Sequence, residues 1–180
     1  MQISDDIIKQ FGINERKAQE HISKKSIADI LDKMCKVSVR IQEKSQLYRN
    51  TEDNDVREDC LDIIISTLNR FSQMFRDVMI RISDEDKGNL GKDSTLRRCI
   101  SEYKKQNISN SESANCFLDQ LNLRNDFIHD YFNDENQILE LETIIYNYSA
   151  EAELIANDIR EYCQEKGYLD LVVDKSDKSV

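Results

Sequence analysis

The sequence predicts an all-α protein, an up-and-down antiparallel bundle of four main helices with a short additional helix at its N-terminus. The chain of 180 residues contains no Pro and only four Gly, so few residues interrupt a helix. Apolar side chains recur every three or four residues through most of the chain. The polar stretches between these segments are short, which favours antiparallel neighbours.

The first half of the chain contains three helical segments. Ser4 and Gly12 delimit a short helix over 5–11, and Asn14 can cap a long helix over about 15–48. The best core helix is expected over about 55–82. Its apolar stripe consists of Val56, Cys60, Ile63, Ile64, Thr67, Phe71, Met74, Phe75, Val78 and Ile82.

A loop over 83–93 leads to a shorter basic helix that ends near residue 106. Gly88 and Gly91 interrupt the helical pattern in this loop. Asp93 or Ser94 is the expected N-cap, because their side chains can accept hydrogen bonds from the first free backbone amides.

Two further helices complete the predicted bundle. One begins at about Ser113, and the last is expected to run without a break over 135–166 and to end at Gly167 as its C′ residue. We therefore expect a single helical domain over 1–167 and a flexible C-terminal tail over 168–180. A length of 180 residues suits one domain.

Charge is unevenly distributed in this acidic chain, whose formal net charge is −10. Residues 87–105 contain six basic and two acidic residues, a net charge of +4, whereas 134–165 contain nine acids and one Arg. The overall charge argues against indiscriminate nucleic-acid binding, so any RNA contact must be local. Each cluster can be a solvated helix face. Alternatively, the basic helix contacts RNA through Lys92, Arg97, Arg98, Lys104 and Lys105.

The sequence predicts a cytoplasmic protein without a membrane segment. No apolar run approaches the length that spans a bilayer, and residues 1–6 lack the basic and apolar regions of a signal peptide. The five cysteines are widely separated and form no C-x-x-C pair. We therefore expect reduced cysteines, mostly in the core, and neither a metal site nor a cofactor.

The candidate catalytic motif is the string Arg124-Asn125-x-x-x-His129-x-Tyr131, which follows an apolar helical stretch and precedes a bend. Arg16 and His21 repeat the spacing of Arg124 and His129 without the flanking Asn and Tyr, so spacing alone is a weak signal.

The fuller string resembles the RNA-cleaving motif of the HEPN superfamily, and its final Tyr is similar to that of HepT-type toxins. The resemblance implies a homodimer in which Arg and His residues of two protomers line one cleft. His129 would be the general base, Arg124 would stabilise the phosphoryl charge, and Asn125 would orient the imidazole. It also implies that an antitoxin, a nucleotidyltransferase, attaches AMP to Tyr131.

The sequence thus leads to two readings of function. The first is a metal-independent endoribonuclease, a toxin or defence effector that cleaves RNA by attack of the ribose 2′-OH. The alternative is a non-catalytic helical module that docks a protein partner through its acidic last helix. Asp126 and Asp130 favour the alternative, because they place negative charge beside a site that would hold phosphate.

Overall fold

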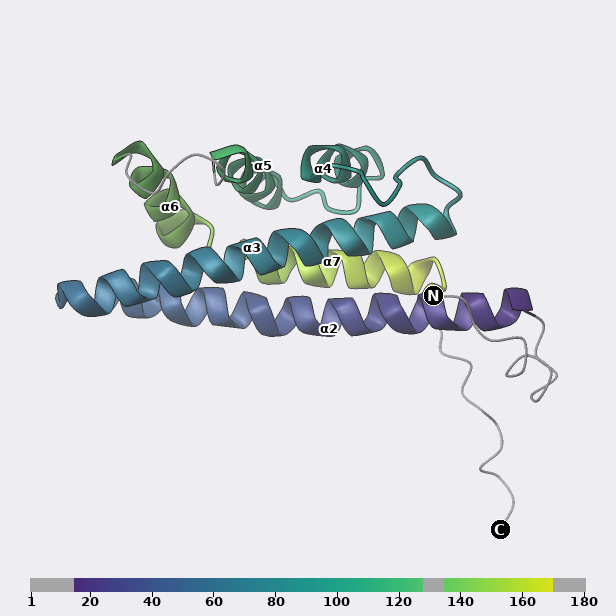
Figure 1. Ribbon diagram of the computed structural model, residues 1–180, viewed down its shortest axis with the longest axis horizontal. Helices are drawn as coiled ribbons and strands as arrows, with labels where there is room; N and C mark the ends of the chain where they lie inside the picture. Colours follow the sequence, from purple (N-terminus) through teal and green to yellow (C-terminus); the bar gives the residue numbers. More distant parts are fainter. Residues whose placement is uncertain (1–14, 128–134, 170–180) are drawn as a thin grey trace, which may run out of the picture.

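The computed structural model describes residues 15–127 and 135–169, with side chains described over 26–123 and 141–169. In these ranges the chain forms six α-helices and no strand, which confirms the predicted all-α bundle (Figure 1). The buried apolar residues of all six helices form one hydrophobic cluster. None of the described helices combines the length and apolar character needed to cross a bilayer. The expected helix over 5–11 and residues 170–180 of the predicted tail over 168–180 lie outside the described residues. Tyr168 and Leu169, the first two residues of that tail, pack against the core, and the Tyr168 hydroxyl donates a hydrogen bond to Asp86.

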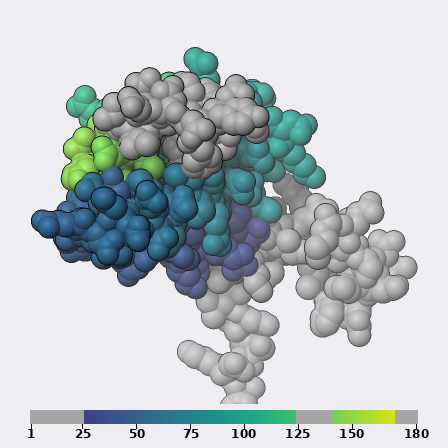
Figure 2. Space-filling view, turned by 60° about the vertical axis from the view of Figure 1, so that its left-hand side comes forward, coloured from purple at the N-terminus to yellow at the C-terminus, as the bar shows by residue number. Residues whose placement is uncertain are grey.

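Helices α2 (Glu15–Asn50) and α3 (Asn54–Glu85) form a long antiparallel pair (Figure 1). The turn between them is short because Asp53 caps α3: its carboxylate accepts hydrogen bonds from the amides of Asp55 at 3.0 Å and Val56 at 3.3 Å. Both helices follow the predicted ranges closely. Figure 2 shows the end of the molecule where they meet, in blue.

The prediction of one continuous helix over 135–166 is wrong, because this segment forms two helices, α6 (Glu135–Asn147) and α7 (Glu151–Glu165). The two run in different directions, and α7 lies along α2 while α6 is inclined to both (Figure 1). Gln42 donates a 2.7 Å hydrogen bond to Glu153, and Arg160 pairs with Asp32 at 2.8 Å. These contacts fix α7 antiparallel to α2.

Helices α4 (Leu96–Lys105) and α5 (Glu112–Phe127) lie across α3 and are seen nearly end-on in Figure 1. Two edge-to-face aromatic contacts hold them there. Phe75 of α3 meets Tyr103 of α4 with ring centroids 5.6 Å apart, and Phe71 meets Phe117 of α5 at 5.9 Å. α3 is therefore the common support on which α4 and α5 become neighbours.

The N-cap of α4 differs from the predicted one. Thr95 accepts the hydrogen bond from the Arg98 amide at 3.3 Å, whereas Ser94 is buried and accepts one from the Gly91 amide at 3.0 Å. Ser94 does not cap the helix, because its hydroxyl is used within the loop. Asp93 does not cap it either, because it lies two residues before the observed cap, Thr95.

Three helices end in the same left-handed turn. The residues with positive φ are Lys87 (54°), Asn107 (51°) and Gly167 (71°), and in each turn the next residue's amide bonds back to a carbonyl five positions earlier. This pattern is the Schellman motif. It confirms Gly167 as the C′ residue of the last helix.

Candidate functional site

The predicted catalytic motif begins in the last turn of α5. Arg124 and Asn125 belong to this helix, whose final residue is Phe127, and α6 begins at Glu135. His129 and Tyr131 lie outside the described residues.

Helix α5 is fixed to the bundle immediately before the motif. Ala114, Phe117, Leu118 and Leu121 are buried, at no more than 2 % exposure each. The helix starts at a serine cap, where the hydroxyl of Ser111 accepts a hydrogen bond from the Ala114 amide at 3.2 Å. The backbone that carries Arg124 and Asn125 thus continues from a well-anchored helix.

Helix α6, on the other side of the motif, is held by a polar cluster at the α2–α3 end. The hydroxyl of Tyr48 donates a 2.6 Å hydrogen bond to Glu142, and the guanidinium of Arg57 lies 4.4 Å from the centre of the Tyr48 ring. Burial, followed by the bond to Glu142, raises the pKa of the Tyr48 phenol. Arg49 also donates to the Ile145 carbonyl at 3.2 Å. Both helices that bound the motif segment are therefore attached to the long α2–α3 pair.

The structure divides the predicted RNA-binding residues between two faces of α4. Arg97 and Lys104, seven residues apart, lie beside α5 and line a pocket. Arg98 and Lys105 do not line that pocket. Lys92 is exposed in the loop before α4.

The basic residues also differ in their partners. Arg98 donates to the Asn89 carbonyl at 3.1 Å, and Lys105 pairs with Glu102 at 3.5 Å. Lys104 Nζ lies 2.7 and 2.9 Å from the two carboxylate oxygens of Asp119. Among the described side chains none forms a hydrogen bond or ion pair with Arg97. Arg97 is thus the cation of α4 that has no hydrogen-bond or ion-pair partner among the described residues.

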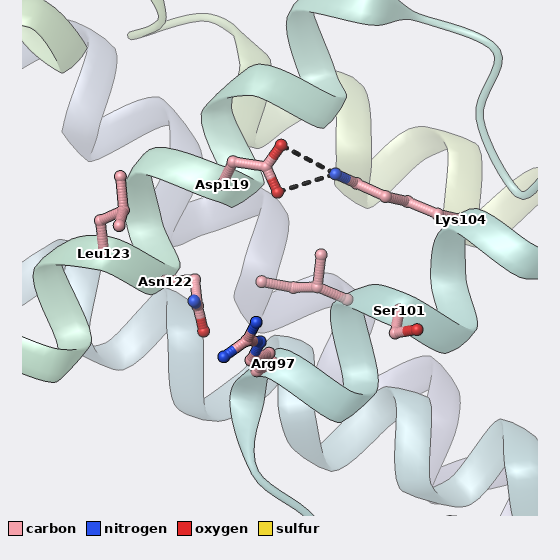
Figure 3. Close-up of a pocket in the computed structure, with 7 residues that line it drawn as sticks. Arg97, Ser101, Lys104, Asp119, Asn122 and Leu123 are labelled. Atoms are coloured by element: carbon pink, nitrogen blue, oxygen red, sulfur yellow. Dashed lines mark hydrogen bonds and ion pairs between the residues drawn. The ribbon is translucent and has the colours of Figure 1, made fainter.

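The pocket between α4 and α5 has a volume of about 470 Å³ and is open to solvent (Figure 3). Arg97 extends from α4 toward Asn122 of α5, and the Lys104–Asp119 pair spans the two helices. The pocket combines polar and apolar walls, which are formed by Arg97, Ile100, Ser101, Lys104, Asp119, Asn122 and Leu123.

Sequence reasoning missed the α5 side of this pocket. Asp119, Asn122 and Leu123 recur at helical spacing and could have been recognised as one face of α5. Nothing in the sequence indicates that this face lies against Arg97 and Lys104. That placement depends on the two aromatic contacts with α3.

Searches with this chain against protein-family models, curated proteins and solved structures found no match in any of the three.

The five cysteines, all in the described part of the chain, form no disulfide. Cys60, Cys99 and Cys163 are buried, and Cys35 and Cys116 are partly buried. This agrees with the predicted role of most of them as small core residues. Burial raises the pKa of the Cys99 thiol to about 11, so this thiol stays protonated at neutral pH.

Proposed function

We propose that this protein is a metal-independent endoribonuclease of the HEPN type, acting as a toxin or defence effector. The observation that carries the proposal is the string Arg124-Asn125-x-x-x-His129-x-Tyr131 at the junction between two bundle helices. Support comes from the anchoring of α5 before the string and of α6 after it. The pocket on α5 directly precedes Arg124 and offers cationic groups for an RNA strand.

The chemistry requires a base, an electrostatic stabiliser and no metal. His129 removes the proton from a ribose 2′-OH, whose oxygen attacks the adjacent phosphorus, and the P–O5′ bond breaks. The products are a 2′,3′-cyclic phosphate and a 5′-OH, which forms when the leaving O5′ takes a proton from water. Arg124 stabilises the negative charge that develops on the phosphoryl oxygens through its fixed fork of donors.

Two copies of the chain are needed for a complete site in this proposal. Arg124 and His129 are five residues apart, which separates them by about 140° around a straight helix. A two-fold axis near the end of α5 would instead bring the Arg of one protomer toward the His of its partner. Asn125 precedes His129 by one helical turn and would orient the imidazole. Tyr131 is the proposed site of AMP transfer by an antitoxin.

The decisive experiment compares the motif with its accidental copy. Arg124→Ala and His129→Ala should each lower RNA cleavage by about 10²- to 10⁴-fold, the usual contribution of a general base. The double variant Arg16→Ala/His21→Ala removes the same spacing from α2 and should cleave like wild type. Circular dichroism checks that helical content is unchanged.

The product and the metal requirement give an independent readout. Cleavage should persist in EDTA and leave a 2′,3′-cyclic phosphate, because attack by the neighbouring 2′-OH needs no metal-bound water. A wild-type protein that cuts no RNA, or a His129→Ala variant of full activity, would refute the nuclease.

The alternative is a docking module that uses the acidic last helix, whose described acids are divided between internal contacts and the surface. Glu142 and Glu153 already bond to Tyr48 and Gln42. Glu151 and Asp158 are half-buried, and in 141–165 the fully exposed acids are Glu161 and Glu165. Of the six acids in 141–165, Glu142 and Glu153 are thus bonded within the bundle, whereas Glu161 and Glu165 leave their charge on the surface.

A further inference from the structure

We propose that the α4–α5 pocket binds one nucleotide of a single-stranded RNA, whose phosphate pairs with Arg97, and that Asp119 competes with this phosphate for Lys104. The choice of RNA as ligand rests on the proposed nuclease function. The placement of Arg97 and of the Lys104–Asp119 ion pair in one pocket does not depend on that proposed function (Figure 3).

The size and lining of the pocket suit a nucleotide better than a bare phosphate ion. Its volume of about 470 Å³ lies in the range of small-molecule sites. The Ser101 hydroxyl and the Asn122 amide can donate hydrogen bonds to phosphate or base. Ile100 and Leu123 supply apolar surface for the sugar or base, and Leu123 is 45 % exposed. A guanidinium such as that of Arg97 binds phosphate through two parallel hydrogen bonds.

The position of the pocket relates it to the motif. Asn122 and Leu123 are the last α5 residues before Arg124. A strand that occupies the pocket would therefore meet the helix that carries the first motif residues.

Asp119 limits the positive charge that the pocket presents. Both of its carboxylate oxygens contact Lys104 Nζ, and the side chains of Lys104 and Asp119 are 35 % and 59 % exposed. Exposed ion pairs of this kind are weak, so a phosphate can displace the carboxylate from the ammonium group. Asp119 thus restrains RNA affinity without closing the site.

The test measures binding of a short labelled single-stranded RNA to the full chain in a His129→Ala background, so that the probe survives. Arg97→Ala should weaken binding about tenfold and reduce the slope of log K against log salt by about 0.7, the value for one lost phosphate contact on a single strand. Arg98→Ala is the matched comparison: Arg98 does not line the pocket and donates to the Asn89 carbonyl, so its loss should weaken binding less than the loss of Arg97.

The competition is tested by freeing each lysine in turn. Asp119→Asn should tighten binding about twofold to fivefold, because Lys104 then becomes available to the phosphate. Glu102→Gln frees Lys105 outside the pocket in the same way and should have no such effect. The gain should disappear in Asp119→Asn/Lys104→Gln.

The outcomes separate this proposal from the nuclease. Equal loss in Arg97→Ala and Arg98→Ala, no RNA binding, or a gain that persists without Lys104 would overturn the pocket assignment, even if cleavage depended on His129. Arg97-dependent binding by a wild-type protein that cleaves nothing would retain the pocket and refute the nuclease.

Discussion

The Tyr48 hydroxyl lies 2.6 Å from the carboxylate of Glu142 and so joins the C-terminal end of α2 to α6. Arg57 of α3 stacks on the same Tyr48 ring, so three helices meet at one side chain. Tyr48 is 3 % exposed and the side chain of Glu142 is 32 % exposed, so this contact lies at the edge of the core.

Tyr48→Phe should lower the free energy of unfolding by about 1 kcal/mol, because it removes a hydrogen bond to a partly buried carboxylate. Amide exchange in α6 should accelerate more than in α2, since α6 loses an anchor. Urea denaturation and hydrogen exchange measure the two effects. Tyr146→Phe is the control, because the Tyr146 side chain is about half exposed. Loss of this exposed hydroxyl should change the free energy of unfolding by less than about 0.5 kcal/mol. Equal stability of Tyr48→Phe and wild type would contradict the prediction.

The left-handed turns predict that glycine is favoured at both helix ends, so removing it at one end and introducing it at the other should change stability in opposite directions. Gly167→Ala places a Cβ at a φ of 71° and should destabilise the protein by about 1 kcal/mol. Lys87→Gly removes a Cβ at a φ of 54° and should stabilise it by up to about 1 kcal/mol, less the extra entropy of the unfolded chain. Thermal unfolding compares both with Gly91→Ala, where an added Cβ has no atom within 4 Å. A loss of stability in Lys87→Gly would show that the side chain contributes more than the strain costs.

Alkaline pH should destabilise the bundle. Burial, together with the nearby carboxylate of Asp86, raises the pKa of Tyr162 and of Cys163 to about 12 in the folded protein. Unfolded thiols and phenols ionise near 9 and 10. Between these values and about 12 the unfolded chain binds fewer protons than the folded one, so stability is complete below about pH 9 and falls as pH rises toward 12.

Urea unfolding at pH 8 and at pH 10.5 measures this dependence. Tyr162→Phe should reduce the loss between the two pH values, whereas Tyr146→Phe serves as the exposed control. A wild-type stability that does not change with pH over this range would refute the assignment of buried, neutral groups.

The composite site predicts a homodimer. Sedimentation at tens of micromolar should give about twice the chain mass of 21.1 kDa. Mixing inactive Arg124→Ala with inactive His129→Ala should restore part of the cleavage, because a mixed dimer retains one Arg and one His at the shared cleft. A protein that remains monomeric, or a mixture that stays inactive while the wild type cleaves, would rule out a site shared between protomers.

The amino-acid sequence determined which segments become helical. The bounds of α2 and α3 agree with apolar spacing of 3.6 residues, and Gly167 is the left-handed residue that its position after the last apolar repeat predicted. These features are local, since each depends on residues within a turn or two along the chain.

The break between α6 and α7 was not visible in the sequence. Ile145 and Ala152, both buried, are seven residues apart, so the apolar stripe stays in phase across residues 148–150. Ala150 occupies the N-cap of α7 without any side-chain hydrogen bond, and no Pro or Gly marks the turn. The break lies between the contacts of α6 with Tyr48 and Arg49 and the contacts of α7 with Gln42 and Asp32, so only the tertiary structure reveals it.

The sequence also predicted that α4 is basic, but it did not predict which face of α4 lies beside α5. The buried stripe of α4 leaves Arg97 and Lys104 on the flank beside α5, and Arg98 and Lys105 on the side of the helix that faces away from the core. Only packing of Tyr103 on Phe75 and of Phe117 on Phe71 decides that the first pair lies beside α5. Sequence spacing thus fixes which residues share a face, whereas contacts between residues distant in the chain decide what that face meets.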